Sequence, residues 1–344
     1  MIDTKLMSYS SPLLRLLSGV LTALVSVTLF VPSIAFAATF SDVPKDHFAH
    51  DAILYLSDRD TLSGYADGTF KPDKKVNRAE ALKLIASEFI PETKAVNLKS
   101  TDFSDVPDNA WYLPAITWAL GKHVIDGPPK TTAFSPSRAV TKSEFLKMLF
   151  VSNGIDAKAF SDIKLPLSSD VTDTSAWYYT HLRYAVATGT TEVSTAGVFG
   201  PNRELTRGDV AVILYRFTLY KSGERTQDLL TLTRQDVEKV ITHLAANNVT
   251  EAEYASARAI LIARGALLTE PDVAVVKVAV KIAEGYRALT RAYRAALSGD
   301  RNAVLKLSAD ASTLADQARK ISPDAKTLAD QLDKYSRSFA QQAR

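Results

Sequence analysis

Three basic residues recur at almost constant spacing, each at the expected start of a helix. Arg78, Lys142 and Arg207 are separated by 64 and 65 positions. A guanidinium group offers a planar fork of donors that matches a carboxylate, and a helix N-terminus adds backbone amides and a favourable dipole. These residues are therefore candidates for holding an anionic group, and Lys142 is the weaker one because an ammonium lacks the fork. The alternative is that each merely pairs with a nearby acid, such as Glu80.

Aromatic residues form a second set of candidates. Phe48, Trp111 and Trp177 are expected to open a first helix in each of three copies. Their flat faces could stack on sugar rings, but a ring edge packed in the core is the favoured interpretation. Tyr65 adjoins a glycine turn that includes Gly68, and it is the better candidate for an exposed aromatic ring. Packing within the turn is the alternative for Tyr65.

These residues belong to a unit that occurs three times. Each copy has an Asp-Val pair, an aromatic residue, an amphipathic run, a Phe-x-Pro turn, and a basic residue two positions before an acid. Pro72, Pro136 and Pro201 keep the separations of 64 and 65 positions, so the register holds across the unit. Because this period exceeds the roughly 20–50 residues of common repeats, each copy is expected to contain two helices and a structured loop.

The second helix of each copy is expected to begin with a capping box. The paired residues are Asn77 with Glu80, Thr141 with Glu144, and Thr206 with Asp209. The third box is expected to be the weakest, since aspartate is shorter than glutamate. The aspartates of the Asp-Val pairs are expected to brace loops, and these are Asp42, Asp105 and Asp170.

The composition changes at about Ser222, where turn residues become rare and Ala, Leu, Val, Lys and Asp dominate. Apolar residues then step by threes and fours over three long stretches, which predicts an antiparallel helical bundle. Two shorter helices are expected near residues 235–246 and 251–264, for about five in all.

The N-terminus has the pattern of a secretory signal. Lys5 and Arg15 precede an apolar run of about 16 residues, and the small residues Ala35 and Ala37 follow it. Cleavage is expected after Ala37; the alternative of a retained anchor is disfavoured because a span needs roughly 20 residues. The sequence has no cysteine and a formal net charge of only +3 without a dense basic block, so disulfides and nucleic-acid binding are not expected.

The three copies resemble the S-layer homology family, whose units carry F-x-D-V-P, G-Y-x-D-G-T-F-x-P and T-R-A-E motifs. The resemblance covers about residues 40–220 and is closest in copy one, which reads FSDVP from residue 40 and GYADGTFKP from residue 64. In copy two the glycine turn is replaced by Asp126-Gly127-Pro128-Pro129, and in copy three by Thr- and Ser-rich sequence. If this turn touches ligand, only copy one retains it, through Gly68.

The resemblance implies that three units share a central helix bundle, with loops outside and three grooves between repeats. An all-α fold is therefore expected, with the repeats in a pseudo-threefold bundle followed by the antiparallel C-terminal bundle. The expected division is a signal peptide at 1–37, repeats at 38–100, 101–165 and 166–221, and the bundle at 222–344.

The expected function is non-catalytic anchoring of an exported protein at the cell surface or S-layer. The resemblance implies that the grooves bind anionic cell-wall polysaccharide, such as a pyruvylated secondary polymer. The alternative is an envelope scaffold whose bundle self-associates or binds a partner protein. No hydrolase, zinc-protease, nucleotide or EF-hand pattern occurs, so no enzyme activity, cofactor or metal is expected. No membrane span is expected in the mature chain. The expected ligand-binding residues are Arg78, Lys142, Arg207, Phe48, Trp111, Trp177, Tyr65 and Gly68.

Overall fold

The computed structural model describes residues 39–89, 101–127, 130–156, 158–194 and 196–343. Two predictions lie outside these residues: the signal peptide at 1–37 and the Pro128-Pro129 part of the copy-two turn.

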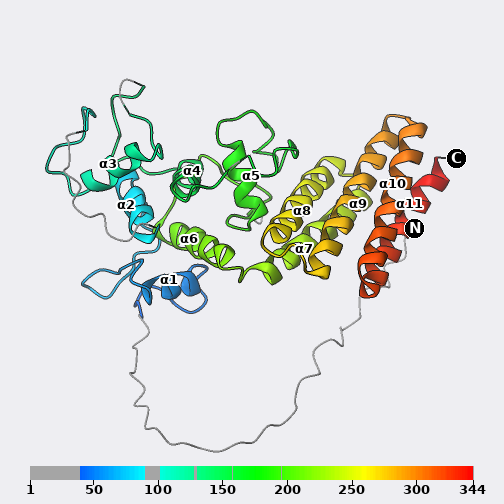
Figure 1. The fold of residues 1–344 in the computed structure, drawn as a ribbon, viewed down its shortest axis with the longest axis horizontal. Coiled ribbons are helices and arrows are strands. Elements are labelled where there is room, and N and C mark those ends of the chain that lie inside the picture. Colours follow the sequence, from blue (N-terminus) through cyan, green and yellow to red (C-terminus); the bar gives the residue numbers. More distant parts are fainter. Residues whose placement is uncertain (1–38, 90–100, 128–129, 157, 195, 344) are drawn as a thin grey trace, which may run out of the picture. The chain divides into compact units, whose positions relative to one another are not determined.

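The described residues form an all-α structure, as predicted, with isolated bridges as their only strand-like pairing. Six helices belong to the repeats: α1 (His50–Ser57), α2 (Arg78–Phe89), α3 (Leu113–Gly121), α4 (Lys142–Ser152), α5 (Tyr179–Ala187) and α6 (Arg207–Lys221). The helices that follow are α7 (Thr226–Ala245), α8 (Val249–Thr269), α9 (Ala274–Leu297), α10 (Arg301–Ile321), the 3₁₀ helix η1 (Pro323–Ala325) and α11 (Lys326–Gln342). Figure 1 shows their order along the chain.

A ring of three backbone hydrogen bonds joins the repeats just before their second helices. The Val76 N–H donates to the Leu205 carbonyl at 3.0 Å, and the Leu205 N–H donates to the Val140 carbonyl at 3.0 Å. The Val140 N–H donates back to the Val76 carbonyl at 2.9 Å, which completes the ring. Each repeat therefore donates to one neighbour and accepts from the other, as a pseudo-threefold arrangement requires.

The helices of neighbouring repeats also pack in a cyclic order. α2 packs against α3, α4 against α5, and α6 against α1, so every first helix contacts the second helix of the preceding repeat. The expected shared bundle therefore includes second helices as well as first helices. No copy needs to bury its own apolar stripe alone, because the next copy covers it.

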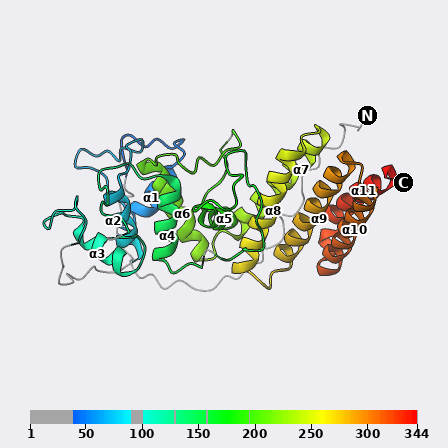
Figure 2. The same ribbon diagram turned by 90° about the horizontal axis from the view of Figure 1, so that it is seen from above.

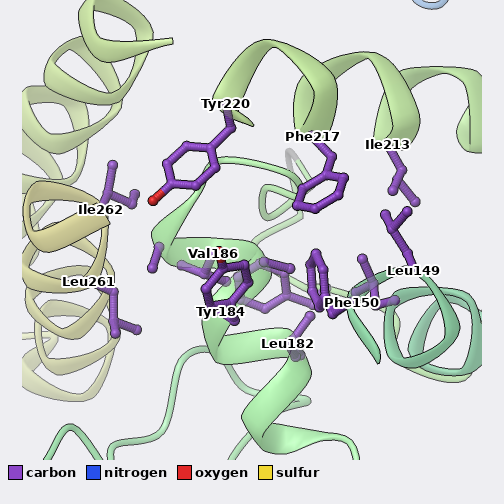
Figure 3. Close-up of a cluster of buried hydrophobic side chains, with 14 of the residues drawn as sticks. Leu149, Phe150, Leu182, Tyr184, Val186, Ile213, Phe217, Tyr220, Leu261 and Ile262 are labelled. Atoms are coloured by element: carbon purple, nitrogen blue, oxygen red, sulfur yellow. The ribbon is translucent and has the colours of Figure 1, made fainter. Parts of the chain in front are cut away.

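The apolar core runs from the repeats to the first bundle helices without a break. The Phe150 ring contacts Tyr184 at 4.9 Å and Phe217 at 5.4 Å between centroids, both edge-to-face. Figure 3 shows Tyr220 of α6 beside these rings, with Leu261 and Ile262 of α8 facing the same cluster. Repeat three and α8 therefore share one core.

Five α-helices, α7 to α11, follow the repeats in the described chain, in agreement with the expected count. Consecutive helices pack against each other along the series, and Figures 1 and 2 both show α8, α9 and α10 side by side. α7 and α8 are longer than the stretches 235–246 and 251–264 predicted for them. The first turns of α7 are rich in polar residues, which hid them, whereas α8 continues past Gly265, a residue that ordinarily weakens a helix.

A buried ion pair connects α7 and α8 to repeat three. The Arg258 guanidinium donates to both Asp236 carboxylate oxygens, at 3.1 and 2.9 Å, and both side chains are almost fully buried. The other terminal nitrogen of Arg258, Nη1, donates to the Leu167 carbonyl at 2.8 Å. Nearby, the Tyr220 hydroxyl donates to the Gly265 carbonyl at 3.1 Å. These bonds fix the register of the bundle on the last repeat.

No helix among the described residues has both the length and the apolar character needed to cross a membrane.

The backbones of α5 and α8 approach each other closely at Gly265. A Cβ atom added there would lie 1.7 Å from the Ala187 carbonyl oxygen, so any side chain would force the helices apart. We expect Gly265→Ala to lower the free energy of unfolding by about 1–3 kcal/mol or more, the range for overpacked cores. Urea unfolding measures this. Gly121→Ala is the matched control, because a Cβ there meets no atom within 4 Å, and equal stability of the two variants would contradict the prediction.

Candidate functional site

The three Asp-Val aspartates hold the Phe-x-Pro turns, as predicted. Each carboxylate accepts hydrogen bonds from two successive backbone amides of the turn in its own repeat. The bonded amides are those of Phe70 and Lys71 for Asp42, Phe134 and Ser135 for Asp105, and Phe199 and Gly200 for Asp170, at 2.7–3.1 Å. Burial opposes ionisation of Asp170, but the bonds from Ser168 and the turn amides outweigh it and lower its pKa. These bonds therefore hold each turn in a defined conformation.

The predicted capping boxes are all present and set where each second helix begins. Asn77 and Glu80 exchange backbone-to-side-chain bonds at 3.0 and 2.8 Å, and the boxes of α4 and α6 are equally complete. The Asp209 box is reinforced by two bonds from Arg203, at 2.7 and 2.8 Å. As a result, Arg78, Lys142 and Arg207 each occupy the first residue of a helix.

Each of these basic side chains reaches the next repeat and donates to the carbonyl of its Phe-x-Pro phenylalanine. Arg78 Nε donates to the Phe134 carbonyl at 3.0 Å, and Arg207 Nε donates to the Phe70 carbonyl at 2.8 Å. Lys142 Nζ donates to the Phe199 carbonyl. The three residues thus tie neighbouring repeats together, whatever else they bind.

Their remaining donors are used differently. Arg78 pairs with Glu144 of repeat two at 3.1 Å, so an acid of the neighbouring copy takes the place of Glu80. Arg207 has no ion pair in the described chain; its guanidinium donates to the Ser63 carbonyl at 2.8 Å and lies 5.2 Å from the Tyr65 ring centroid. The predicted candidates Arg207 and Tyr65 are therefore brought together.

Lys142 differs most from the other two. Its side chain is only 6% exposed. Burial, aided by the charge of Arg203, lowers the pKa of Lys142 to about 8. A cation this enclosed presents little charge to a ligand in solvent.

A cavity of about 200 Å³ lies beside Arg78, and we call it the Arg78 groove. It is lined by residues of all three repeats, and its polar and aromatic lining comprises Arg78, Asp126, Thr131, Phe134, Glu144, Lys147 and Trp177. A carboxylate oxygen of Asp126 lies 4.0 Å from Lys147 Nζ. The structure therefore brings the predicted residues Arg78 and Trp177 into one site. His181 of α5 comes four residues after Trp177, and burial together with the charge of Lys147 lowers its pKa to about 4. The imidazole is thus neutral at pH 7, so the cations of the site are Arg78 and Lys147.

The repeat register identifies the equivalent positions around Arg207 and Lys142. The positions matching Arg78, Phe134, Lys147 and Trp177 are Arg207, Phe70, Lys83 and Trp111 in what we call the Arg207 set, and Lys142, Phe199, Val212 and Phe48 in the Lys142 set. In the Arg207 set, Lys83 Nζ lies 5.3 Å from the Trp111 ring centroid. The Lys142 set has a valine in place of that lysine and a phenylalanine in place of tryptophan.

The three predicted aromatic residues are more exposed than core packing requires. Phe48 is 64% exposed, Trp111 56% and Trp177 57%. The favoured interpretation, that they mainly pack in the core, is therefore wrong. Phe48 touches the backbone of repeat three, since a Cβ on Gly208 would lie 3.1 Å from its ring.

The copy-one turn has a defined conformation around the other two candidates. Gly68 has a φ of +78°, which suits glycine, and its N–H donates to the Tyr65 carbonyl at 3.0 Å. The Tyr65 hydroxyl accepts from Lys74 Nζ at 3.1 Å, and Lys71 Nζ lies 4.1 Å from the ring centroid. Tyr65 thus stands among three cations when Arg207 is included.

Two further sets of basic residues were missed by the sequence analysis. Lys74, Arg138 and Arg203 pair with the capping acids Glu80, Glu144 and Asp209, respectively. Lys83 and Lys147 are the lysines beside the exposed tryptophans. The first set keeps the separations of 64 and 65 positions and the two lysines are 64 apart, which is the signal that could have revealed them.

Comparison with known proteins identifies the family of these repeats. The S-layer homology domain family matches residues 39–82, 102–146 and 169–211. The chain is an S-layer homology domain protein with three tandem repeats, and this family indicates an exported protein of the cell surface or cell wall.

Individual relatives have different names. The chain is 30% identical over 199 residues to the surface-layer 125 kDa protein of Lysinibacillus sphaericus, covering 57% of this chain and 16% of that protein. It is 24% identical over 262 residues to an S-layer protein of Bacillus thuringiensis subsp. finitimus, covering 72% and 30%. It is 31% identical over 198 residues to an amylopullulanase of Thermoanaerobacterium thermosulfurigenes, covering 54% and 10%. The chain thus spans less than a third of the length of these relatives.

The depressed pKa of Lys142 predicts a dependence of stability on pH. Between pH 8 and the ordinary lysine value of 10.5, the unfolded chain still binds a proton that the folded protein has released. Stability attributable to this group therefore rises with pH across that window. We expect the free energy of unfolding of the wild type, minus that of Lys142→Met, to increase from pH 8 to pH 10. Urea unfolding at intervals of one pH unit measures the difference, and a flat difference would contradict the assignment.

Proposed function

We propose that this protein anchors itself to the cell surface without catalysis, by binding an anionic cell-wall polysaccharide in grooves between its repeats. The observation that carries the proposal is the Arg78 groove, where Arg78, Lys147 and Trp177 line one cavity. A polymer that bears carboxylates, such as a pyruvylated secondary polymer, matches this combination. The cations would hold the carboxylate, and the exposed indole would stack on a sugar ring.

Arg78 presents a positive charge and unused hydrogen-bond donors to the groove. Burial lowers the pKa of Arg78 from its ordinary value, but the group stays protonated at neutral pH. Glu144 pairs with Arg78 and Asp126 with Lys147, and the additional cations Arg138 on Glu144 and Lys130 on Asp126 leave the local charge positive. Arg78 uses Nε and one terminal nitrogen in its bonds to Phe134 and Glu144. The other terminal nitrogen has donors left for a ligand, because a guanidinium has five N–H groups.

The three sites are not equivalent in this proposal. The Arg78 groove and the Arg207 set each combine an arginine, a lysine and an exposed tryptophan, whereas the Lys142 set combines a buried lysine with valine and phenylalanine. We infer that the first two sites carry binding and that the third contributes little. Two weak sites on one rigid body still raise the overall affinity, provided that one polymer can reach both.

Anchoring also accounts for the mixed names of the relatives. The similar segment occurs in surface-layer proteins and in an amylopullulanase, of which it covers 16% and 10% in the two cases given above. A segment found with such different partners is better explained as an attachment module than as a catalytic one. The role of residues 222–344 as a separate domain, and their self-association, stay predictions.

Removing an exposed tryptophan tests the proposal without cutting a tie between repeats. We expect Trp177→Ala to weaken binding of residues 38–344 to purified wall sacculi by about tenfold, roughly 1.4 kcal/mol, with Trp111→Ala similar. Phe48→Ala is the matched control, at the equivalent exposed position of the Lys142 set. Binding is measured by co-sedimentation, with the melting temperature as a check on folding. Equal losses in all three variants would remove the distinction between sites.

The same assay tests the chemistry of the polymer. Attraction between cations and carboxylates at partly exposed sites is screened by salt, so binding should fall steeply between low and physiological ionic strength. Sacculi stripped of their anionic secondary polymers serve as the control. Undiminished binding to the stripped wall would overturn the anionic-polymer proposal while leaving attachment to another wall component.

A further inference from the structure

A second cavity, of about 440 Å³, lies in the bundle and has no part in the grooves between repeats. α8, α9 and α10 form its walls together with Leu165 and Pro166, which precede the Asp-Val pair of repeat three. α9 places Arg287, Arg291 and Arg294 in this cavity. Residues four and three positions apart share one helix face, so the three guanidinium groups converge on the same space.

Two of these arginines have no protein anion to bind. Arg294 is accounted for, since it donates to both Glu253 carboxylate oxygens at 3.0 and 2.6 Å. Among the residues that the structure describes, Arg287 and Arg291 make neither a hydrogen bond nor an ion pair. Burial and the charge of Arg291 lower the pKa of Arg287, and the charge of Glu253 opposes this shift without reversing it.

Such an arrangement is unfavourable without a counter-ion. Like charges four residues apart on a helix repel each other. Arg287 is half-buried and also loses hydration, whereas Arg291 is exposed. The hydroxyls nearby do not compensate: among the described residues, neither Arg287 nor Arg291 donates to Ser256 or Thr290, whose hydroxyls donate to carbonyls of their own helices at 2.9 Å. An anion bound between Arg287 and Arg291 would remove both costs.

The rest of the lining defines the ligand further. Leu165, Pro166, Ala295 and Leu307 contribute apolar walls beside the arginines. Guanidinium forks match the oxygens of a carboxylate or a phosphate. The geometry points to a binding site for a small organic anion, whose carboxylate or phosphate is held by Arg287 and Arg291 while an apolar portion lies against Leu165, Pro166 and Leu307.

Because Leu165 and Pro166 lie at the junction of repeats two and three, a ligand in this cavity would contact the repeats and the bundle at once. Binding would stabilise the packing of α8 and α9 on the last repeat, and so raise the melting temperature of the whole chain.

Calorimetric titration of residues 38–344 with four probes tests the site: acetate, benzoate, inorganic phosphate and phenyl phosphate. We expect the two aromatic anions to bind at least several-fold more tightly than their small counterparts, and the better of the two to identify the anionic group. In Arg287→Gln/Arg291→Gln the affinity should fall at least tenfold. Arg234→Gln, which removes an exposed surface arginine of α7, is the control and should bind like the wild type. Absence of binding by all four probes, or equal binding by the double variant, would overturn the proposal.

Stability without ligand separates a binding role from a structural one. In dilute buffer without multivalent anions, the double variant should melt at the same temperature as the wild type or higher, because it loses a repulsive pair. Phenyl phosphate or benzoate should then raise the melting temperature of the wild type alone. A double variant that melts well below the wild type in dilute buffer would show that the arginines support the fold, and would overturn the inference.

Discussion

The ring of hydrogen bonds among Val76, Val140 and Leu205 is the constraint on which the repeat region depends. Each strand-like segment satisfies its own donor and acceptor only when both neighbours are present. Each capping box begins at the very next residue, so the ring also fixes where the second helices start. Everything proposed for the grooves follows from this placement, because it sets the basic first residue of each helix against the turn of the next repeat.

The three basic residues Arg78, Lys142 and Arg207 hold the fold together with donor groups of the same kind that would bind a ligand. The donors that suit a ligand carboxylate also suit the carbonyl of a neighbouring phenylalanine, and the fold has used one from each side chain. Arginine tolerates this double use because its fork has donors on three nitrogens, whereas lysine presents a single nitrogen. Lys142 is buried and directed at Phe199, and the same repeat junction lacks the tryptophan and second lysine found at the others. The differences at that junction are therefore consistent with each other.

The sequence predicted much of this structure because register survives in linear spacing. The capping boxes, the bracing aspartates and the helix positions are local, and each could be derived from residues within about thirty positions of one another. The burial of individual side chains could not be derived in the same way. Phe48, Trp111 and Trp177 have spacing consistent with a core and yet lie exposed, and Lys142 has the spacing of a surface cation and yet is buried. Which repeat covers which side chain depends on contacts across the ring, and spacing does not encode them.

The unpaired arginines of α9 illustrate the same limit. Arg287, Arg291 and Arg294 follow ordinary helical spacing, and only the packing of α8 and the Leu165-Pro166 segment turns that face into a cavity. Glu253 then neutralises one of the three, which is again a contact between residues distant in sequence.

A cyclic arrangement of repeats differs from a stacked one in how it is made and how it can change. In a linear solenoid each unit packs only against its neighbours, so copies can be added or lost at the two ends. Here the first copy hydrogen-bonds directly to the third, across more than a hundred residues from Val76 to Leu205, so neither end is vacant. A fourth copy would have no place to insert, and an emerging polypeptide cannot finish its first unit until the last has been synthesised. The ring of hydrogen bonds is complete only when all three copies are present, so the number three is a property of its geometry.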